Sequence, residues 1–219
     1  METKTSYQKR QLSKTREQII PGLLNTIGAK KGVEIGVFKG GWSKHLLENW
    51  NGTLYMIDPW RPLGEEYDDA SNHAMHTDAY ERAMESIRGL EDRGFMLRGL
   101  GEQIVDIFED DSLDFVYIDG NHAYDYVKQD MELWWPKLKK GGLFAGHDYL
   151  LMDWQYKPDI DHPNQKDKFI WSNDGTEGAE LRYAGVFGVN PAVEEFCEEN
   201  GIKILNLTSE WTSTWFFTK

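Results

Sequence analysis

The sequence predicts one α/β domain with a Rossmann-like, doubly wound and mostly parallel sheet of seven strands. Its 219 residues are enough for one large domain with a full hydrophobic core. Short apolar runs typical of buried strands alternate with amphipathic segments typical of helices, which favours a parallel sheet covered on both faces. A glycine-rich turn joins the first such strand to a helix. The last two strands are expected to add an antiparallel hairpin at the edge.

The expected elements follow the chain in order. Residues 1–28 are expected to form an N-terminal helical arm, in which Pro21 opens a helix. Apolar runs bounded by turn residues predict strands at 33–35, 53–57, 95–97, 113–118, 143–145, 202–207 and 215–218. Helical patterns begin or run at 43–47, 79–90, 104–108, 124–137 and from Pro191 onwards.

Two segments fit neither pattern. Residues 61–78 are polar and too long for a simple connection, and residues 149–184 are rich in Asp, Pro, Asn, Trp and Tyr. We expect both to be lid or substrate loops of the one domain, residues 1–219. The second segment has an alternative role as a contact to another subunit, which would make the protein a homodimer.

Charge and composition exclude several classes of partner. The net charge of −13 repels the phosphate backbone of nucleic acids. No apolar run approaches the roughly 18 residues that a membrane span needs, and the polar N-terminus does not resemble a signal peptide. A single cysteine rules out an internal disulfide framework. We therefore expect a soluble, cytoplasmic protein that binds neither nucleic acid nor membrane.

The glycine-rich turn is a candidate cofactor site. Gly36, Gly40 and Gly41 allow a ligand to approach the main chain at the start of a helix. The dinucleotide fingerprint would require a glycine where this chain has Phe38, and no Gly-Lys-Ser/Thr follows for a P-loop. Glu34, just before the turn, disfavours a pyrophosphate and favours a ligand with a positive charge. A plain strand-to-helix turn remains the alternative interpretation.

Asp58 ends the next predicted strand, 22 positions beyond Gly36. Nucleotide-binding α/β folds place there the acid that binds ribose hydroxyls.

Two further acids end neighbouring predicted strands, Asp119 in VYIDGNH and Asp148 in FAGHDY. The carboxyl ends of parallel strands face one crevice, so both side chains should point to the same place beside the glycine turn. Two close carboxylates repel each other unless a cation lies between them, and oxygen ligands suit Mg²⁺ or Mn²⁺. His147 and His122 add imidazole nitrogens to this cluster.

Four motifs in this order resemble those of class I S-adenosylmethionine-dependent methyltransferases of the family 24 type: VEIGVFKGG, YMIDPW, SLDFVYIDGNHAYDYVKQD and LKKGGLFAGHDY. The resemblance covers about residues 30–150 and extends to metal-dependent small-molecule O-methyltransferases, including catechol O-methyltransferase. It implies an enzyme that uses S-adenosyl-L-methionine and, with it, Mg²⁺ or Mn²⁺.

The resemblance also implies a role for each residue of the site. Asp58 would bind the ribose hydroxyls of the cofactor, and residues 101–103 the adenine. The metal ligands would be Asp119, Asp148 and His147, the last where relatives commonly have another acid. The complete set of implied cofactor contacts is Glu34, Gly36, Val37, Phe38, Gly40, Gly41, Ser43, Asp58, Pro59, Trp60, Gly101, Glu102, Gln103 and Asp119.

The expected reaction is the transfer of methyl from sulfonium to a hydroxyl of a small molecule such as a sugar or natural product. A metal would lower the hydroxyl pKa, and His122 would act with Asp119 as the catalytic pair by removing the proton. His122 lies where catechol-type relatives keep a lysine; its alternative role is to hydrogen-bond the loop. Two other functions stay open, an NAD-dependent oxidoreductase and a non-catalytic cofactor-binding module.

Overall fold

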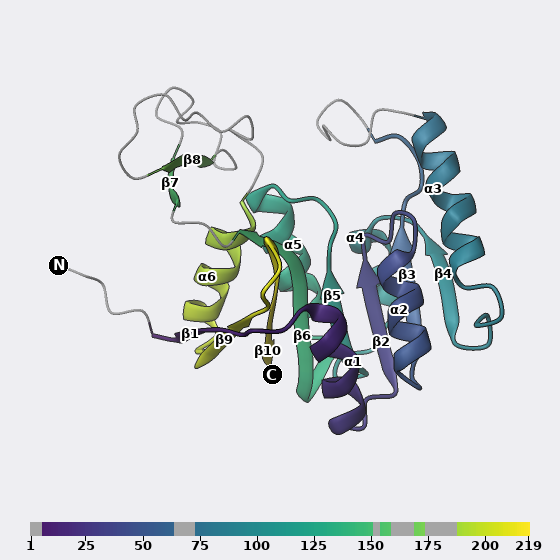
Figure 1. Ribbon diagram of the computed structural model, residues 1–219, viewed down its shortest axis with the longest axis horizontal. Helices are drawn as coiled ribbons and strands as arrows, with labels where there is room; N and C mark the ends of the chain where they lie inside the picture. Colours follow the sequence, from purple (N-terminus) through teal and green to yellow (C-terminus); the bar gives the residue numbers. More distant parts are fainter. Residues whose placement is uncertain (1–5, 64–72, 151–153, 159–168, 174–187) are drawn as a thin grey trace.

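A sheet of eight strands runs through the centre of the described residues, 6–63, 73–150, 154–158, 169–173 and 188–219 of this computed structural model (Figure 1). The strand order is β1-β9-β10-β6-β5-β2-β3-β4, with β1 at one edge and β4 at the other. The bounds are β1 Gln8–Gln11, β2 Lys31–Ile35, β3 Thr53–Asp58, β4 Gly94–Arg98, β5 Leu113–Ile118, β6 Leu138–Leu150, β9 Ile204–Leu207 and β10 Thr212–Thr218.

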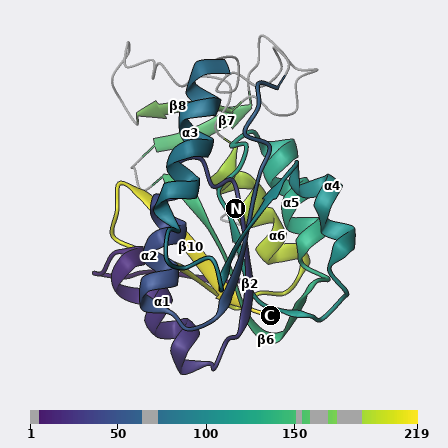
Figure 2. The same cartoon turned by 90° about the vertical axis from the view of Figure 1, so that its right-hand side faces the viewer.

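Helices cover both faces of the sheet, as the alternating pattern predicts (Figure 2). One apolar core joins α1, α2 and α3 to the sheet, and a second lies under α5 and α6. Their bounds are α1 Arg16–Thr26, α2 Gly41–Asn49, α3 His73–Ser86, α4 Gly101–Ile104, η2 Val105–Ile107 (a 3-10 helix), α5 Tyr124–Trp134 and α6 Val189–Glu199. No helix among the described residues is long and apolar enough to cross a membrane.

The register of the central strands brings the predicted site residues to one edge. Strands β3, β2, β5 and β6 are parallel, and Ile35 pairs with both Ile57 and Ile118, which in turn pairs with Gly146. The residues that follow these partners therefore lie at one level of the sheet: Gly36, Asp58, Asp119 and His147. The expectation that the strand ends converge is confirmed.

The sequence suggested that the N-terminal arm is helical, but only part of it is. Gln8 to Gln11 form an eighth strand, β1, parallel to β9, so the β9–β10 hairpin is not the outermost part of the sheet. All four β1 residues are exposed, and the strand is held by main-chain pairing with β9. Its sequence has no apolar alternation from which a strand could be predicted. Strand β10 lies between β9 and β6 and is antiparallel to both.

Helix α1 begins at Arg16, five residues before the proline that was expected to open it. Gln18 accepts a hydrogen bond from the Thr15 N–H and so caps the first turn. Pro21, inside the helix, has no N–H to donate to the carbonyl of Glu17. The His45 Nε2 atom of α2 lies 3.1 Å from that carbonyl, so a second helix supplies the missing contact.

Other helices and strands also begin or end at residues that differ from the predicted bounds. Strand β6 extends across the predicted turn, where Gly141 adopts φ +82°. Its pairing with β5 passes from Leu138 directly to Leu143, so the residues between them form a bulge in the ladder. The helix expected over 104–108 is one short α-turn followed by a 3-10 turn, and α6 begins two residues before Pro191. Helix α3 begins inside the predicted loop 61–78, at His73.

Most of the two predicted loops lies outside the described residues. Residues 64–72 belong to the first loop, and residues 151–153, 159–168 and 174–187 belong mainly to the second. The described parts of the second loop form the antiparallel pair β7 (Trp154–Pro158) and β8 (Phe169–Asn173).

Candidate active site

The glycine turn after β2 is packed against the turn after β5. Gly36 has φ +85°, and a Cβ atom at this position would lie 2.0 Å from the carbonyl oxygen of Asp119. Its N–H donates to the carbonyl of Ile57, while the Asp119 N–H donates to the carbonyl of Ile35. A glycine is therefore needed at position 36 because two protein loops approach each other closely there, whether or not a ligand is bound. This packing holds the predicted cofactor turn beside Asp119.

Replacing Gly36 with alanine is expected to lower the free energy of unfolding by about 2 to 4 kcal/mol, because the new Cβ meets main-chain atoms at a positive φ. Urea denaturation would measure the loss. Gly41→Ala is the matched control, since no atom lies within 4 Å of its Cβ position and alanine is the better helix former. Equal stability of the two variants would contradict this explanation of Gly36.

Asp58 holds the other side of the glycine turn. Its Oδ2 atom accepts hydrogen bonds from the N–H groups of Val37 and Phe38, at 3.0 and 2.9 Å, and its Oδ1 atom accepts one from Trp60 at 2.7 Å. The Trp60 indole in turn donates to the carbonyl of Phe38, whose own φ is +51°. The carboxylate thus lies at the turn where the sequence predicted it, between the ends of β2 and β3.

Glu34 is buried beneath this turn rather than at the surface. Only 1% of the residue is exposed, and its Oε2 atom accepts a hydrogen bond of 2.5 Å from Ser43 of α2. Burial raises the pKa of Glu34 to about 8, and the charges of Asp119 and Asp58 act in the same direction. Glu34 is therefore a buried carboxyl that a cationic ligand would favour in its ionised form.

This pKa predicts a particular dependence of stability on pH. Between the ordinary value of 4.5 and about 8, folded Glu34 holds a proton that the unfolded chain has lost. The free energy of unfolding should therefore fall as pH rises through that interval, by up to about 1.4 kcal/mol per pH unit from this group. Glu34→Gln removes this contribution, which urea denaturation at pH 5 and pH 8 would detect. An unchanged pH dependence in the variant would contradict the assignment.

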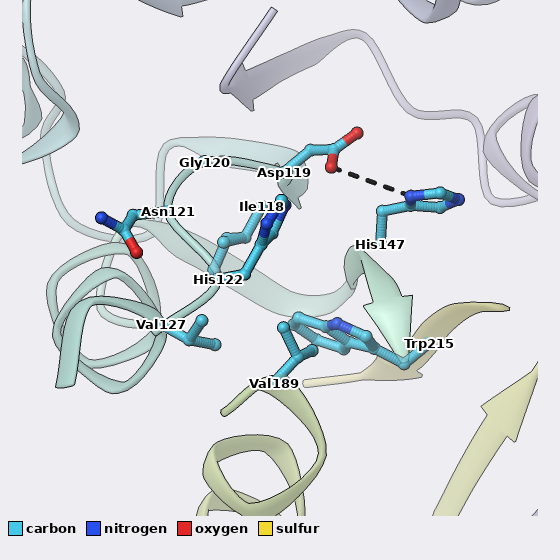
Figure 3. Close-up of a pocket in the computed structure, with 9 residues that line it drawn as sticks. All are labelled: Ile118, Asp119, Gly120, Asn121, His122, Val127, His147, Val189 and Trp215. Atoms are coloured by element: carbon cyan, nitrogen blue, oxygen red, sulfur yellow. Dashed lines mark ion pairs between the residues drawn. The ribbon is translucent and has the colours of Figure 1, made fainter. Parts of the chain in front are cut away.

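Asp119, just after β5, and Asp148, near the end of β6, lie together with two histidines. Figure 3 shows Asp119 with His122 and His147. His122 Nε2 is 2.9 Å from Asp148 Oδ2, and His147 Nδ1 is 3.2 Å from Asp148 Oδ1 and 3.8 Å from Asp119 Oδ1. One ligand atom from each of Asp119, His122 and Asp148 lies within 4.8 Å of the others. The sequence placed both histidines in this cluster, and the family resemblance implied His147 as the metal ligand, whereas this tighter group contains His122.

Local backbone geometry positions these side chains. Gly146 pairs with Trp215 and Tyr149 with Ser213, so the register of β6 against β10 shifts over His147 and Asp148. Asp148 adopts φ +59°, a left-handed conformation that costs a non-glycine residue energy and is frequent at functional sites. The irregularity turns both side chains of this dipeptide towards the strand ends.

The turn that carries His122 is held at both sides. The Asn121 side chain accepts a hydrogen bond from the Ala123 N–H before α5, and the Gly188 N–H at the start of α6 donates to the His122 carbonyl. His122 also lines a pocket with Val127, Val189 and Trp215, which Figure 3 shows beneath the imidazole.

The two carboxyl groups have opposite electrostatic environments. Burial raises the pKa of Asp119 to about 6, with the Asp148 charge adding to the rise and His147 opposing it. Burial also acts on Asp148, but its hydrogen bonds to His122 and His147 hold the pKa of that carboxyl below its usual range. Asp148 is therefore ionised at neutral pH, and the cluster can bind a cation or accept a proton.

The residues predicted to contact adenine form α4, next to α5. The Gln103 side chain accepts a hydrogen bond from the Leu100 N–H, and Glu102 accepts one of 2.9 Å from Gln129. Gly101 is buried, with Asp130 and Trp134 of α5 around its Cβ position. These residues lie at the end of β4, one strand beyond Asp58 in the sheet.

Sequence reasoning missed one group at this edge, the Arg16 side chain. Its Nη1 atom donates to the Tyr117 hydroxyl at 2.9 Å and lies 3.7 Å from Asp119 Oδ2. Arg16 and Tyr117 are 101 positions apart, and Arg16 belongs to no motif. Only the position of α1 against the sheet reveals the contact.

Comparison with known proteins agrees with the motifs. The family described as "Methyltransferase domain" matches residues 33–149, more than half of the chain. An uncharacterized protein of Acanthamoeba polyphaga mimivirus is 28% identical over 131 residues, 58% of this chain and 54% of that protein. An uncharacterized protein of Sinorhizobium fredii is 31% identical over 97 residues, 38% of this chain and 11% of that protein. The chain thus spans about half or less of these curated relatives.

Solved structures share the fold at low sequence identity. The O-methyltransferase of Bacillus cereus in complex with SAH superposes with a TM-score of 0.55 at 15% identity, covering 95% of this chain and 82% of that one. TomG of Streptomyces achromogenes, an O-methyltransferase in complex with SAM, gives a TM-score of 0.55 at 15% identity, with 93% and 79% covered. The mostly parallel sheet with antiparallel C-terminal strands is therefore a Rossmann-like methyltransferase fold.

Proposed function

The chain belongs to the methyltransferase domain family, and from this we propose that it transfers methyl from S-adenosylmethionine to a hydroxyl of a small molecule, assisted by a divalent metal ion. The observation that carries the proposal is the register that brings the glycine turn, Asp58 and the acid–histidine cluster to one edge of the sheet. A cofactor bound at the turn would present its methyl group beside that cluster.

The residues of the turn fit S-adenosylmethionine. The cofactor has a positively charged sulfonium and an ammonium group, and Glu34, Asp58 and Asp119 supply carboxyl groups around the turn. The family resemblance assigns its methionine part to the glycine turn and Glu34, and its ribose to Asp58. The SAH and SAM complexes of the two structural neighbours support this choice of cofactor.

The cluster also fits a divalent metal. The carboxylates of Asp119 and Asp148 lie within 4.8 Å of the His122 imidazole, and His147 Nδ1 lies 3.2 Å from Asp148 and 3.8 Å from Asp119. Such a mixed oxygen and nitrogen donor set is suited to Mg²⁺ or Mn²⁺. We assign Asp119 and Asp148 as the carboxylate ligands, with His147 as the nitrogen ligand beside them. When bound, the ion would supply Lewis-acid chemistry that lowers the pKa of a substrate hydroxyl.

We assign His122 as the general base that removes the proton of the acceptor hydroxyl. Its Nε2 atom contacts Asp148 at 2.9 Å, which orients the ring and places the lone pair on Nδ1. This is the arrangement of an imidazole base held by a carboxylate. The hydrogen bonds of the Asn121 side chain and of the Gly188 N–H hold the backbone at and next to His122. The apolar lining from Val127, Val189 and Trp215 limits the access of water to one side of it.

The acceptor is proposed to be a neutral or cationic sugar or natural-product hydroxyl, because the net charge of −13 disfavours anions. Incubation with S-adenosylmethionine labelled in its methyl group, a panel of such acceptors, and Mg²⁺ or Mn²⁺ should yield a labelled product detected by mass spectrometry. Cofactor binding without transfer to any acceptor would favour a binding module. Thermal stabilisation by NAD but not by S-adenosylmethionine would favour an oxidoreductase.

A further inference from the structure

Arg16 reaches the site from the N-terminal arm. The guanidinium carbon lies 4.8 Å from the centroid of the Trp42 ring in the first turn of α2, directly after the glycine turn. Its Nη1 atom donates to Tyr117, which in turn contacts Thr214 Oγ1 at 2.9 Å, so the planar group is fixed on two sides. The main chain of Arg16 is also held, because its N–H donates to Glu210 at 2.5 Å.

Some N–H groups of this guanidinium form no hydrogen bond to any described residue. Its Nε atom bonds Glu17 at 3.2 Å and its Nη1 atom bonds Tyr117, while Asp119 at 3.7 Å is an ion-pair neighbour beyond hydrogen-bond distance. Within the described part of the chain, Nη2 makes no hydrogen bond. A guanidinium presents five N–H donors in a plane, a geometry that matches the two oxygens of a carboxylate. The side chain is only 20% exposed, so such a pair would be weakly screened by water.

The acidic groups around the glycine turn favour a cationic side chain at the position of Arg16. Four acids, Glu34, Asp58, Asp119 and Asp148, lie at or near the strand ends, and those that are ionised would repel a bound carboxylate. Among the described residues, Arg16 is the one arginine or lysine that forms an ion pair with any of these four acids. S-adenosylmethionine has a carboxylate as well as its two cationic groups, and a cation beside the turn would offset the repulsion of that carboxylate by the acids.

We infer that Arg16 binds the carboxylate of the methionine part of S-adenosylmethionine, with Nη2 and the second Nη1 hydrogen as donors. The inference rests on the proposed function. It gives the N-terminal arm a role in cofactor recognition: α1 carries the one group that distinguishes the intact amino-acid end from an amine. Trp42 and Tyr117 act as positioning residues that hold the guanidinium in place.

The test compares two ligands that differ only in the carboxylate. Isothermal titration calorimetry should measure the Kd of S-adenosylmethionine and of its decarboxylated derivative, which keeps the adenosine, the sulfonium and the amine. We expect the unmodified protein to prefer S-adenosylmethionine. Arg16→Met should raise the Kd of S-adenosylmethionine about 10- to 100-fold and change that of the decarboxylated ligand less than about twofold. Arg16→Lys should restore part of the preference, since it keeps the charge but not the planar geometry.

Arg88→Met is the matched control, because Arg88 is exposed and, among the residues that the structure describes, forms its ion pair with the nearby Glu85 alone. It should leave both Kd values unchanged. If Arg16→Met weakens both ligands equally, the arginine is a structural brace and the inference fails. It also fails if the preference is unchanged, or if only the KM of the acceptor rises. Failure of the unmodified protein to bind either ligand would instead overturn the proposed function, and the inference with it.

Discussion

Replacing Asp119 with asparagine is expected to lower kcat for methyl transfer by about 10²- to 10³-fold while leaving the protein folded. The carboxylate is a proposed metal ligand at the end of β5, and an amide of the same shape has no charge with which to hold the cation. Burial already disfavours its charged form, raising the pKa to about 6, so the amide should not lower the free energy of unfolding at pH 8.

Loss of activity with retained stability is the signature of a functional acid. Both quantities can be measured on one preparation, by a labelled-methyl assay and by urea denaturation. Asp125→Asn, on the exposed face of α5, is the control and should change neither. An Asp119→Asn variant with unaltered kcat at saturating metal would remove Asp119 from the mechanism.

Replacing His122 with glutamine is expected to lower kcat by about 10²- to 10⁴-fold, the contribution of a positioned general base. Glutamine can still donate a hydrogen bond to Asp148, which His122 contacts at 2.9 Å, but it cannot take a proton from the acceptor. The rate with labelled cofactor should stay low at every concentration of Mg²⁺ or Mn²⁺.

His147→Gln separates the two roles assigned to the histidines. As a metal ligand beside Asp148, His147 should affect the metal concentration needed for half-maximal rate more than the rate at saturation. The opposite pattern, with His122→Gln rescued by excess metal, would show that His122 is the ligand. That outcome would agree with the group of Asp119, His122 and Asp148 seen in the structure.

Much of the site could be predicted from the sequence because its residues follow local patterns. Each of Glu34, Asp58, Asp119 and Asp148 lies at or just beyond an apolar run that forms a strand. Right-handed crossovers between parallel strands bring the carboxyl ends of those runs to one edge. The cluster was therefore predictable without knowledge of any long-range contact.

The parts that were not predictable depend on contacts between distant segments. Strand β1 is polar and exposed, so only its pairing with β9 identifies it. Gly36 could be assigned to a ligand from its position, but its packing against the Asp119 carbonyl needs the relative position of two loops. Arg16 is the first residue of an ordinary helix, and its contact with Tyr117 follows from how α1 lies on the sheet. Local periodicity contains no information on such contacts.

The central claim is that a sulfonium donor lies between the glycine turn and the two acids at the ends of β5 and β6. A crystal structure of the protein with S-adenosylhomocysteine and Mn²⁺ tests it most directly. We expect the thioether product to lie along Gly36, with its ribose at Asp58 and the metal between Asp119 and Asp148. Well-ordered crystals grown at saturating ligand that show this edge closed by protein atoms, or the nucleoside bound elsewhere, would contradict it.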